Sequence, residues 1–256
     1  MLIQSLPAGL SDPQALPSTL QPGAAVALTL DAAIDLKIGQ LLCSRLCHDL
    51  IGPAAAVSAG GELMLDEDTS AADGADVRDL IVESGRQLAG RLSFFRVAFG
   101  PAGARASGLS RAQVRELAQG FLHGGRVQLD WPAPAGADDR PLAADAARVL
   151  LCLILLAVDA LPHGGRLGVG VHRQGNDTCL SVMAAGRSAH IGDELVDALQ
   201  ATEVRAVTPR TVHAFYLTRL VERLRASLVI EGTDPLELRA LVPQAGRDLE
   251  KAAVSG

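Results

Sequence analysis

The stretch LLCSRLCHDLIGPAAAVSAGGELM, residues 41–64, decides how the N-terminal part of this chain folds. Its leucines continue an apolar stripe that begins upstream and repeats at the spacing of an α-helix. The stripe predicts one long helix from Asp31 to about Leu65, with Pro53 as a position where the helix can kink. Its main members are Ile34, Ile38, Leu41, Leu42, Leu46, Leu50 and Val57.

A second apolar stripe follows the polar, acidic segment DEDTSAADGAD and runs from Val77 to Phe95. Glycine and proline residues end it near Gly100. Two such helices form an antiparallel hairpin, which cannot bury two apolar stripes by itself. Pairing of two copies would complete a four-helix bundle, so we predict a homodimer through residues 32–100.

His48 carries chemistry of its own, and three interpretations compete. On a helical wheel it lies at the flank of the stripe, where a histidine needs no function. A metal site would use Cys43 and Cys47, but His48 points about 100° away from Cys47 and a structural zinc site needs four ligands. We therefore interpret both cysteines as small core residues. A nucleophile needs a neutral imidazole, and the adjacent Asp49 can hold one ring nitrogen while the other attacks.

Two further polar residues, Ser44 and Arg45, lie one turn before His48. They could contact a partner or a phosphoryl oxygen. A solvated helix face would explain them equally well.

Beyond Gly108 the pattern becomes mixed, which predicts an α+β sandwich with helices on one face of a mixed or antiparallel sheet. Ser110 is the expected N-cap of the first helix, and Pro141 stands near the start of the second. The expected helices cover residues 109–124, 141–161 and 208–224, and the expected strands cover 126–131, 165–173, 178–185, 227–232 and 236–243.

Composition narrows the function classes. The 256 residues carry a net charge of −6 and only 3% aromatic residues, so nothing indicates nucleic-acid binding. Four cysteines form no disulfide framework, and the most apolar run is too short to span a membrane. We expect a cytoplasmic protein that does not associate with membranes. Residues 1–30, rich in Pro, Ala, Ser and Gln, are expected to be a disordered tail.

The segment His48-Asp49-Leu50-Ile51-Gly52-Pro53 resembles the H-box of sensor histidine kinases, in which a histidine and an acidic residue precede a proline. The predicted hairpin resembles their dimerisation and phosphotransfer domain. The following α+β unit is similar in element order to their ATP-binding domain, including a helix that leads into a Gly-Gly strand, as VDALPHGGRLGV does here.

Three motifs that this resemblance would require in an active kinase are missing. The two Asn positions of the magnesium-binding helix are occupied by Cys152 and Leu156, and the adenine-reading Asp is replaced by Ala184. The glycine-rich lid reads His213-Ala214-Phe215-Tyr216-Leu217. Each change removes a group that would hold magnesium, adenine or phosphate, so ATP binding is not expected.

The stretches LLCSRLCHDLIGPAAAVSAGGELM and RLSFFRVAFG closely resemble the two bundle helices of ChpT-type histidine phosphotransferases, which keep the H-box and lack the nucleotide site. The resemblance covers roughly residues 32–245, with Gly52 where the family often has a small polar residue. It implies a phosphotransfer hairpin at residues 32–102 and a degenerate ATPase-like domain at residues 105–250, in a cytoplasmic homodimer.

The resemblance further implies a function in a multistep phosphorelay. His48, assisted by Asp49, would accept a phosphoryl group from the receiver domain of a hybrid histidine kinase and pass it to the receiver aspartates of response regulators. Ser44, Arg45, Gly52 and Pro53 would support the site or contact the partner. Mg²⁺ would belong to the receiver, so no cofactor is expected on this chain. The alternatives are a divergent ATP-dependent histidine kinase and a non-catalytic scaffold that binds receivers.

Overall fold

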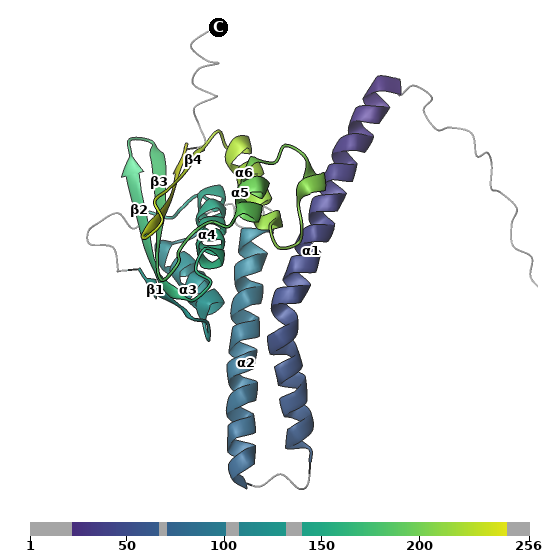
Figure 1. The fold of residues 1–256 in the computed structure, drawn as a ribbon, viewed down its shortest axis with the longest axis vertical. Helices are drawn as coiled ribbons and strands as arrows, with labels where there is room; N and C mark the ends of the chain where they lie inside the picture. The colour runs from purple at the N-terminus through teal and green to yellow at the C-terminus, as the bar shows by residue number, and fades with distance from the viewer. Residues whose placement is uncertain (1–21, 67–70, 101–107, 132–139, 245–256) are drawn as a thin grey trace, which may run out of the picture. The chain divides into compact units, whose positions relative to one another are not determined.

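The structure is a computed structural model that describes residues 22–66, 71–100, 108–131 and 140–244 (Figure 1). For residues 22–35 and 71–73 only the backbone is described. The chain divides into two compact units, Met1–Lys37 and Ile38–Gly256. The predicted domain boundary between residues 102 and 105 falls inside the second unit, within residues 101–107, which lie outside the described part of the chain.

The predicted N-terminal helical hairpin is confirmed. Helix α1 covers Pro22–Met64 and runs through Pro53, and α2 covers Ala71–Ala98. Of the segment predicted to be disordered, residues 1–21 lie outside the described residues, whereas residues 22–30 belong to α1. A helical start at Pro22 agrees with two physical preferences: proline suits the first turn of a helix, and the following Ala and Leu residues are strong helix formers.

The two hairpin helices approach each other at a small residue. A Cβ atom placed on Gly60 of α1 would lie 2.6 Å from Cγ1 of Ile81 on α2, so a larger residue here would require the Ile81 side chain or the helices to shift. Nearer the other end of the hairpin, the Arg91 guanidinium on α2 donates a hydrogen bond to the carbonyl oxygen of Asp49 on α1. These contacts fix the register of α1 against α2.

The C-terminal part contains the five predicted strands in one mixed sheet, and the structure gives their order as β1-β2-β3-β5-β4. Strand β1 pairs in parallel with β2, and all other neighbours are antiparallel. The connections β2–β3 and β4–β5 are antiparallel hairpins. The strands are β1 Val127–Asp130, β2 Gly165–Gln174, β3 Asp177–Ala185, β4 Ser227–Glu231 and β5 Leu236–Val242.

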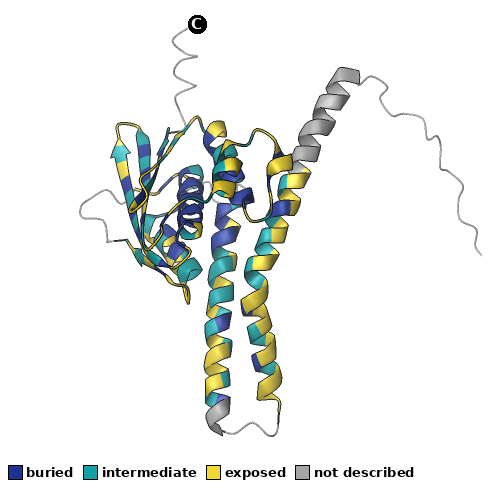
Figure 2. Ribbon diagram, viewed as in Figure 1, coloured by how far each residue is buried: buried dark blue, intermediate teal, exposed yellow. Residues whose placement is uncertain are grey.

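Helices α3 (Arg111–Leu122), α4 (Ala144–Asp159) and α6 (Val212–Arg223) pack on one side of this sheet (Figure 1). Helix α4 lies at the centre of the hydrophobic core, because every residue from Ala146 to Ala157 is buried. Figure 2 shows the same concentration of buried residues in α4 and at the adjoining end of α2. A helix that is apolar on all sides is stable in water only in such a position.

Three element boundaries differ from the sequence prediction. Helix α4 begins at Ala144 rather than Pro141, because Leu142 is extended and exchanges backbone hydrogen bonds with Leu109. Helix α6 begins at Val212 rather than Thr208, in accord with the preference for extended backbone before a proline such as Pro209. Helix α5 (Asp193–Gln200) and the 3₁₀ turn Val204–Ala206 were not predicted.

The last turns of α2 enter the core of the C-terminal part through aromatic contacts. Phe94 stacks on Phe121 of α3 at a centroid distance of 4.2 Å, and Phe95 meets the same ring edge-on at 5.7 Å. Phe99 contacts Tyr216 of α6 edge-on at 5.3 Å. Such pairs add to the gain from apolar burial, so the end of α2 is continuous with the sheet domain's core.

Among the residues that the structure describes, no helix is both long and apolar enough to cross a bilayer.

The predicted N-cap at Ser110 forms a complete capping box with Gln113. We expect Ser110→Ala to lower the free energy of unfolding by about 1 kcal/mol, because the backbone N–H of Gln113 loses its acceptor. Urea denaturation measures this change. Gln119→Ala, at an exposed position of the same helix, is the matched control and should change stability by less than about 0.5 kcal/mol. Equal effects of the two substitutions would contradict the capping role.

Candidate functional site

His48 projects from α1 into solvent. Its side chain is 81% exposed, which agrees with the flank position expected from the helical wheel. Nδ1 lies 3.2 Å from Oδ1 of Asp49, the residue that sequence reasoning selected as its partner. If the proton sits on Nδ1 and is donated to this carboxylate, the lone pair of Nε2 is left for a reaction at the surface.

Asp49 connects His48 to a buried cation. Its second oxygen, Oδ2, lies 3.5 Å from Nε of Arg45, one helical turn earlier. The Asp49 side chain is 24% exposed, so it is turned partly inward. One carboxylate therefore faces the imidazole with one oxygen and the guanidinium with the other.

Arg45 does not lie on a solvated helix face, one of the two interpretations left open by the sequence. Its side chain is only 10% exposed. Nη2 donates to both carboxylate oxygens of Asp159, at 3.3 and 3.0 Å, where α4 ends. Nη1 donates to Nδ1 of His213 on α6, at 3.0 Å, and to the carbonyl oxygen of Arg210. The two terminal nitrogens thus bind three segments of the C-terminal part, whereas Nε contacts the Asp49 carboxylate as an ion pair without a hydrogen bond.

A groove beside His48 is built from both parts of the second unit. Helix α1 contributes Ser44, Arg45, His48 and Asp49, and the C-terminal part contributes Asp159, Glu194, Thr208, Pro209 and Arg210. Sequence reasoning missed the second group. One feature of the sequence could have indicated this second group: Asp159 is an acidic residue directly after the apolar run 149–158.

The remaining sequence candidates near His48 fall in different environments. Ser44 is exposed and lines the groove, and Pro53 is buried. Gly52 is exposed, and a Cβ atom there would meet no neighbouring atom within 4 Å, so the small polar residue expected at this position would fit. The interpretation of Cys43 and Cys47 as core residues is wrong for this chain, because both are exposed.

Burial sets the protonation of the buried part of the cluster. The pKa of His213 lies well below its usual value, first because the ring is desolvated and second because of the Arg45 charge. The neutral ring accepts from Arg45 at Nδ1 and carries its proton on Nε2, which faces Asp159 Oδ2 at 3.2 Å without hydrogen-bond alignment. Burial also raises the pKa of Asp159, and the adjacent Arg45 opposes that shift.

The positions that correspond to the lost nucleotide motifs are filled by core side chains. Cys152, Leu156 and Ala184 have no exposed surface, and burial raises the pKa of the Cys152 thiol to about 12. The segment aligned with the glycine-rich lid forms part of helix α6. Across the described residues, no group of three or more His, Cys, Asp or Glu side chains is placed to hold a metal ion.

Two comparisons with known proteins both point to phosphotransferases. Residues 111–235 match the family model described as the histidine phosphotransferase C-terminal domain. Among curated proteins, the protein phosphotransferase ChpT of Brucella abortus (strain 2308) is 27% identical over 199 residues, which cover 77% of this chain and 91% of that protein.

One solved structure agrees with these two matches. The structure of a bacterial phosphotransferase superposes with a TM-score of 0.67 and 26% identity, covering 88% of this chain and all of that one. A histidine kinase domain, from the blue-light activated kinase EL346 of Erythrobacter litoralis, has a TM-score of 0.41 and 13% identity over 84% of this chain and 94% of that one.

The low pKa of His213 predicts a pH-dependent stability. The unfolded chain binds a proton at His213 near the ordinary pKa of 6.5, whereas the folded protein does not, so stability is lost as pH falls through that value. We expect the free energy of unfolding to drop by about 1 kcal/mol between about pH 7.5 and about pH 5.5 because of this residue. The raised pKa of Asp159 acts in the opposite direction, as that carboxylate takes up its proton more readily in the folded state.

Urea denaturation at both pH values checks this expectation in wild type and in His213→Asn. The asparagine can keep an acceptor for Arg45 but cannot be protonated. The pH dependence should shrink in the variant by about the amount attributed to His213. An identical pH dependence in both proteins would show that His213 is not buried in its neutral form.

Proposed function

The chain is a ChpT-like histidine phosphotransferase, a protein of phosphorelays, and from this premise we propose that His48 is the residue that carries the phosphoryl group. The donor would be an aspartyl phosphate on the receiver domain of a hybrid histidine kinase, and the acceptors would be the receiver aspartates of response regulators. The observation that carries the proposal is the pairing of a solvent-exposed His48 with Asp49 at 3.2 Å.

Exposure and orientation both suit transfer between proteins. A phosphoryl group bound to a partner can reach His48 only if the ring projects from the surface, as its 81% exposed side chain does. The adjacent groove gives a partner a surface to dock on, with walls from α1 and from the segment Thr208–Arg210. Positioning of this kind is the main contribution a protein makes to phosphoryl transfer.

The proposed step is an in-line displacement. The Nε2 lone pair of His48 forms a bond to phosphorus as the phosphorus–oxygen bond to the receiver aspartate breaks. That aspartate leaves as a carboxylate with the bonding electron pair. The ring keeps its proton on Nδ1 and becomes positively charged, and Asp49 stabilises this charge. In the second transfer a new receiver carboxylate attacks phosphorus, and the electron pair of the nitrogen–phosphorus bond returns to Nε2.

We infer that the phosphoryl group does not come from ATP bound to this chain. Magnesium needs oxygen ligands, whereas the two positions aligned with the magnesium-binding Asn residues are the buried side chains Cys152 and Leu156. The position aligned with the adenine-reading carboxylate is the buried Ala184. The Mg²⁺ that neutralises charge during transfer would be held by the receiver domain.

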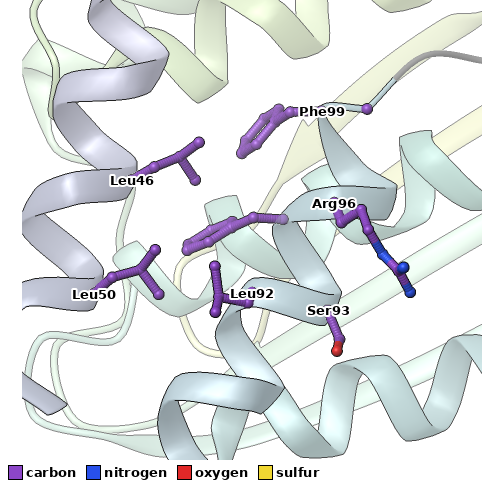
Figure 3. A pocket seen from close by; sticks show the side chains of 8 residues that line it. Leu46, Leu50, Leu92, Ser93, Arg96 and Phe99 are labelled. Atoms are coloured by element: carbon purple, nitrogen blue, oxygen red, sulfur yellow. The ribbon is translucent and has the colours of Figure 1, made fainter. Parts of the chain in front are cut away.

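We further propose that two copies pair through the hairpin. An apolar groove lies between α1 and α2, lined by Leu46 and Leu50 on one side and by Leu92, Phe95 and Phe99 on the other (Figure 3). Large apolar side chains elsewhere on the hairpin are also exposed, among them Ile51 at 67% and Val82 at 49%. An apolar surface of this kind on two helices fits burial against the same surface of a second copy in a four-helix bundle.

A receiver domain phosphorylated with radiolabelled acetyl phosphate tests the role of His48. We expect label to move to the wild-type chain and not to His48→Ala, because the variant lacks the nucleophile. The label should be labile in acid and stable in base. His172→Ala, which removes another exposed histidine, on β2, is the matched control and should accept label as wild type does.

An arm with radiolabelled ATP and no receiver separates the alternative functions. Label from ATP alone would support a divergent kinase. If receivers bind both proteins but label neither, a non-catalytic scaffold is the better description. Transfer to His48→Ala at the wild-type rate would place the acceptor elsewhere in the chain.

The proposed homodimer predicts a specific sensitivity at Leu92, which lines the apolar groove and is 49% exposed. We expect Leu92→Glu to convert the dimer to a monomer, because a charged carboxylate would have to be desolvated within an apolar interface. Val229→Glu, at a 39% exposed position on β4, should remain dimeric. Sedimentation equilibrium of wild type and both variants over a range of concentrations measures this. A monomeric wild type, or dissociation by both substitutions, would contradict pairing through the hairpin.

A further inference from the structure

The buried cluster around Arg45 joins the exposed end of the site to residues far away in the chain. Arg45 faces Asp49 with Nε, at 3.5 Å from Oδ2, and faces Asp159 and His213 with its two terminal nitrogens. Asp49 in turn faces His48. The contacts thus form an unbroken series from His213 on α6 and Asp159 at the end of α4 to the ring of His48 on α1.

We propose that Asp159 and His213 are positioning residues for phosphoryl transfer: by clamping Arg45, they hold Asp49 in the orientation that selects the Nδ1–H tautomer of His48. The sheet domain would then do more than support the hairpin, because it would help to determine which ring nitrogen of His48 can attack. This inference rests on the proposed role of His48.

The clamp on Arg45 restricts its movement. Asp159 binds Nη2 with both carboxylate oxygens, and Nη1 is held by His213 and by the carbonyl oxygen of Arg210. With both terminal nitrogens held, Nε is directed toward α1, where the carboxylate of Asp49 lies. The planar fork of arginine is suited to such a geometry, whereas a lysine ammonium could not bind these separate acceptors in one plane.

The position of Asp49 matters because a half-buried aspartate next to an exposed histidine can still adopt several rotamers. Only a rotamer that brings one oxygen to Nδ1 fixes the tautomer of the ring. The attraction of Arg45 for Oδ2 favours the observed rotamer, in which Oδ1 is 3.2 Å from Nδ1 of His48. An imidazole without such a partner favours the Nε2–H tautomer in water, and that form has no lone pair at Nε2.

The contacts of Asp49 with other elements do not replace this arrangement. Arg91 of α2 donates to the backbone carbonyl of Asp49, and this bond orients the helix rather than the carboxylate. Within the described residues that line the groove, Glu194 is the other acidic side chain of the C-terminal part, and it carries a charge of the wrong sign to hold Asp49.

The test measures the tautomer of His48 by long-range proton–nitrogen NMR of protein labelled with ¹⁵N-histidine. The His48 signals are those missing from His48→Ala. We expect the Nδ1–H tautomer to predominate in wild type and the Nε2–H tautomer to predominate in Arg45→Gln. Asp159→Asn should shift the ratio in the same direction, although Asp159 makes no hydrogen bond to His48. A merely structural role of Arg45 or Asp159 would lower stability and leave the tautomer unchanged.

Two further variants serve as controls. One tests whether loss of any buried arginine changes the His48 tautomer, and the other tests whether the charge of Arg45 is enough without its fork geometry. Arg148→Gln removes an arginine whose side chain is 6% exposed and which also pairs with an aspartate, Asp145, but lies outside the cluster. It should leave the His48 tautomer as in wild type. Arg45→Lys keeps the charge but loses the fork, so its tautomer ratio should resemble that of Arg45→Gln. A wild-type ratio in Arg45→Lys would show that charge alone suffices and would overturn the clamp.

Transfer from a phosphorylated receiver gives the functional readout. We expect Asp159→Asn to slow labelling of His48 by roughly 10-fold to 100-fold, the size of effect that misplacement of a reacting group produces. Asp159 is 29% exposed, so this variant should fold even if Arg45→Gln does not. An unchanged ratio or an unchanged rate in Asp159→Asn would overturn the proposal. Because the tautomer is measured without a receiver, a wild type that accepts no label would refute the proposed function and leave the NMR result interpretable.

Discussion

The way in which α1 joins the rest of the second unit depends on how the largely buried guanidinium of Arg45 is satisfied. Arg45 leaves water when α1 packs against the sheet domain, and a buried charge without partners would cost several kcal/mol. It keeps its partners only if the end of α4, the start of α6 and one turn of α1 are all in place. The orientation of α1 toward the sheet domain is therefore coupled to the integrity of this cluster, as is the groove in which His48 stands.

The second helix of the hairpin is held by a different kind of contact. The rings at the end of α2 pack on Phe121 and Tyr216, so the second helix continues into the apolar core instead of passing through a separate linker. Charge on the α1 side and aromatic packing on the α2 side together restrain the hairpin. A site whose walls come from both parts needs such restraint, because phosphoryl transfer depends strongly on position.

The apolar centre of α4 bears on the proposal that His48 receives its phosphoryl group from a partner and not from ATP bound to this chain. In the histidine kinases that the sequence resembles, polar residues would line this region. Here Cys152, Leu156 and Ala184 contribute to a continuous core, and that core supports the elements that present Asp159 and His213 to Arg45. The replacement of the kinase motifs and the rigid support of the elements around Arg45 are compatible, since both follow from filling the same region with apolar side chains.

The sequence by itself determined the helical hairpin, the strands of the mixed sheet, the capped start of α3 and the pairing of His48 with Asp49. All of these features depend on hydrophobic periodicity or on residues within one helical turn of each other, so they can be predicted from short stretches of sequence. It could not place Arg45, whose partners Asp159 and His213 lie 114 and 168 residues further along the chain. It also misplaced Cys43 and Cys47, because a helical stripe does not tell which of its flanks another element covers. Those features were decided by tertiary structure, since buried charges are satisfied by whichever helix ends meet in space.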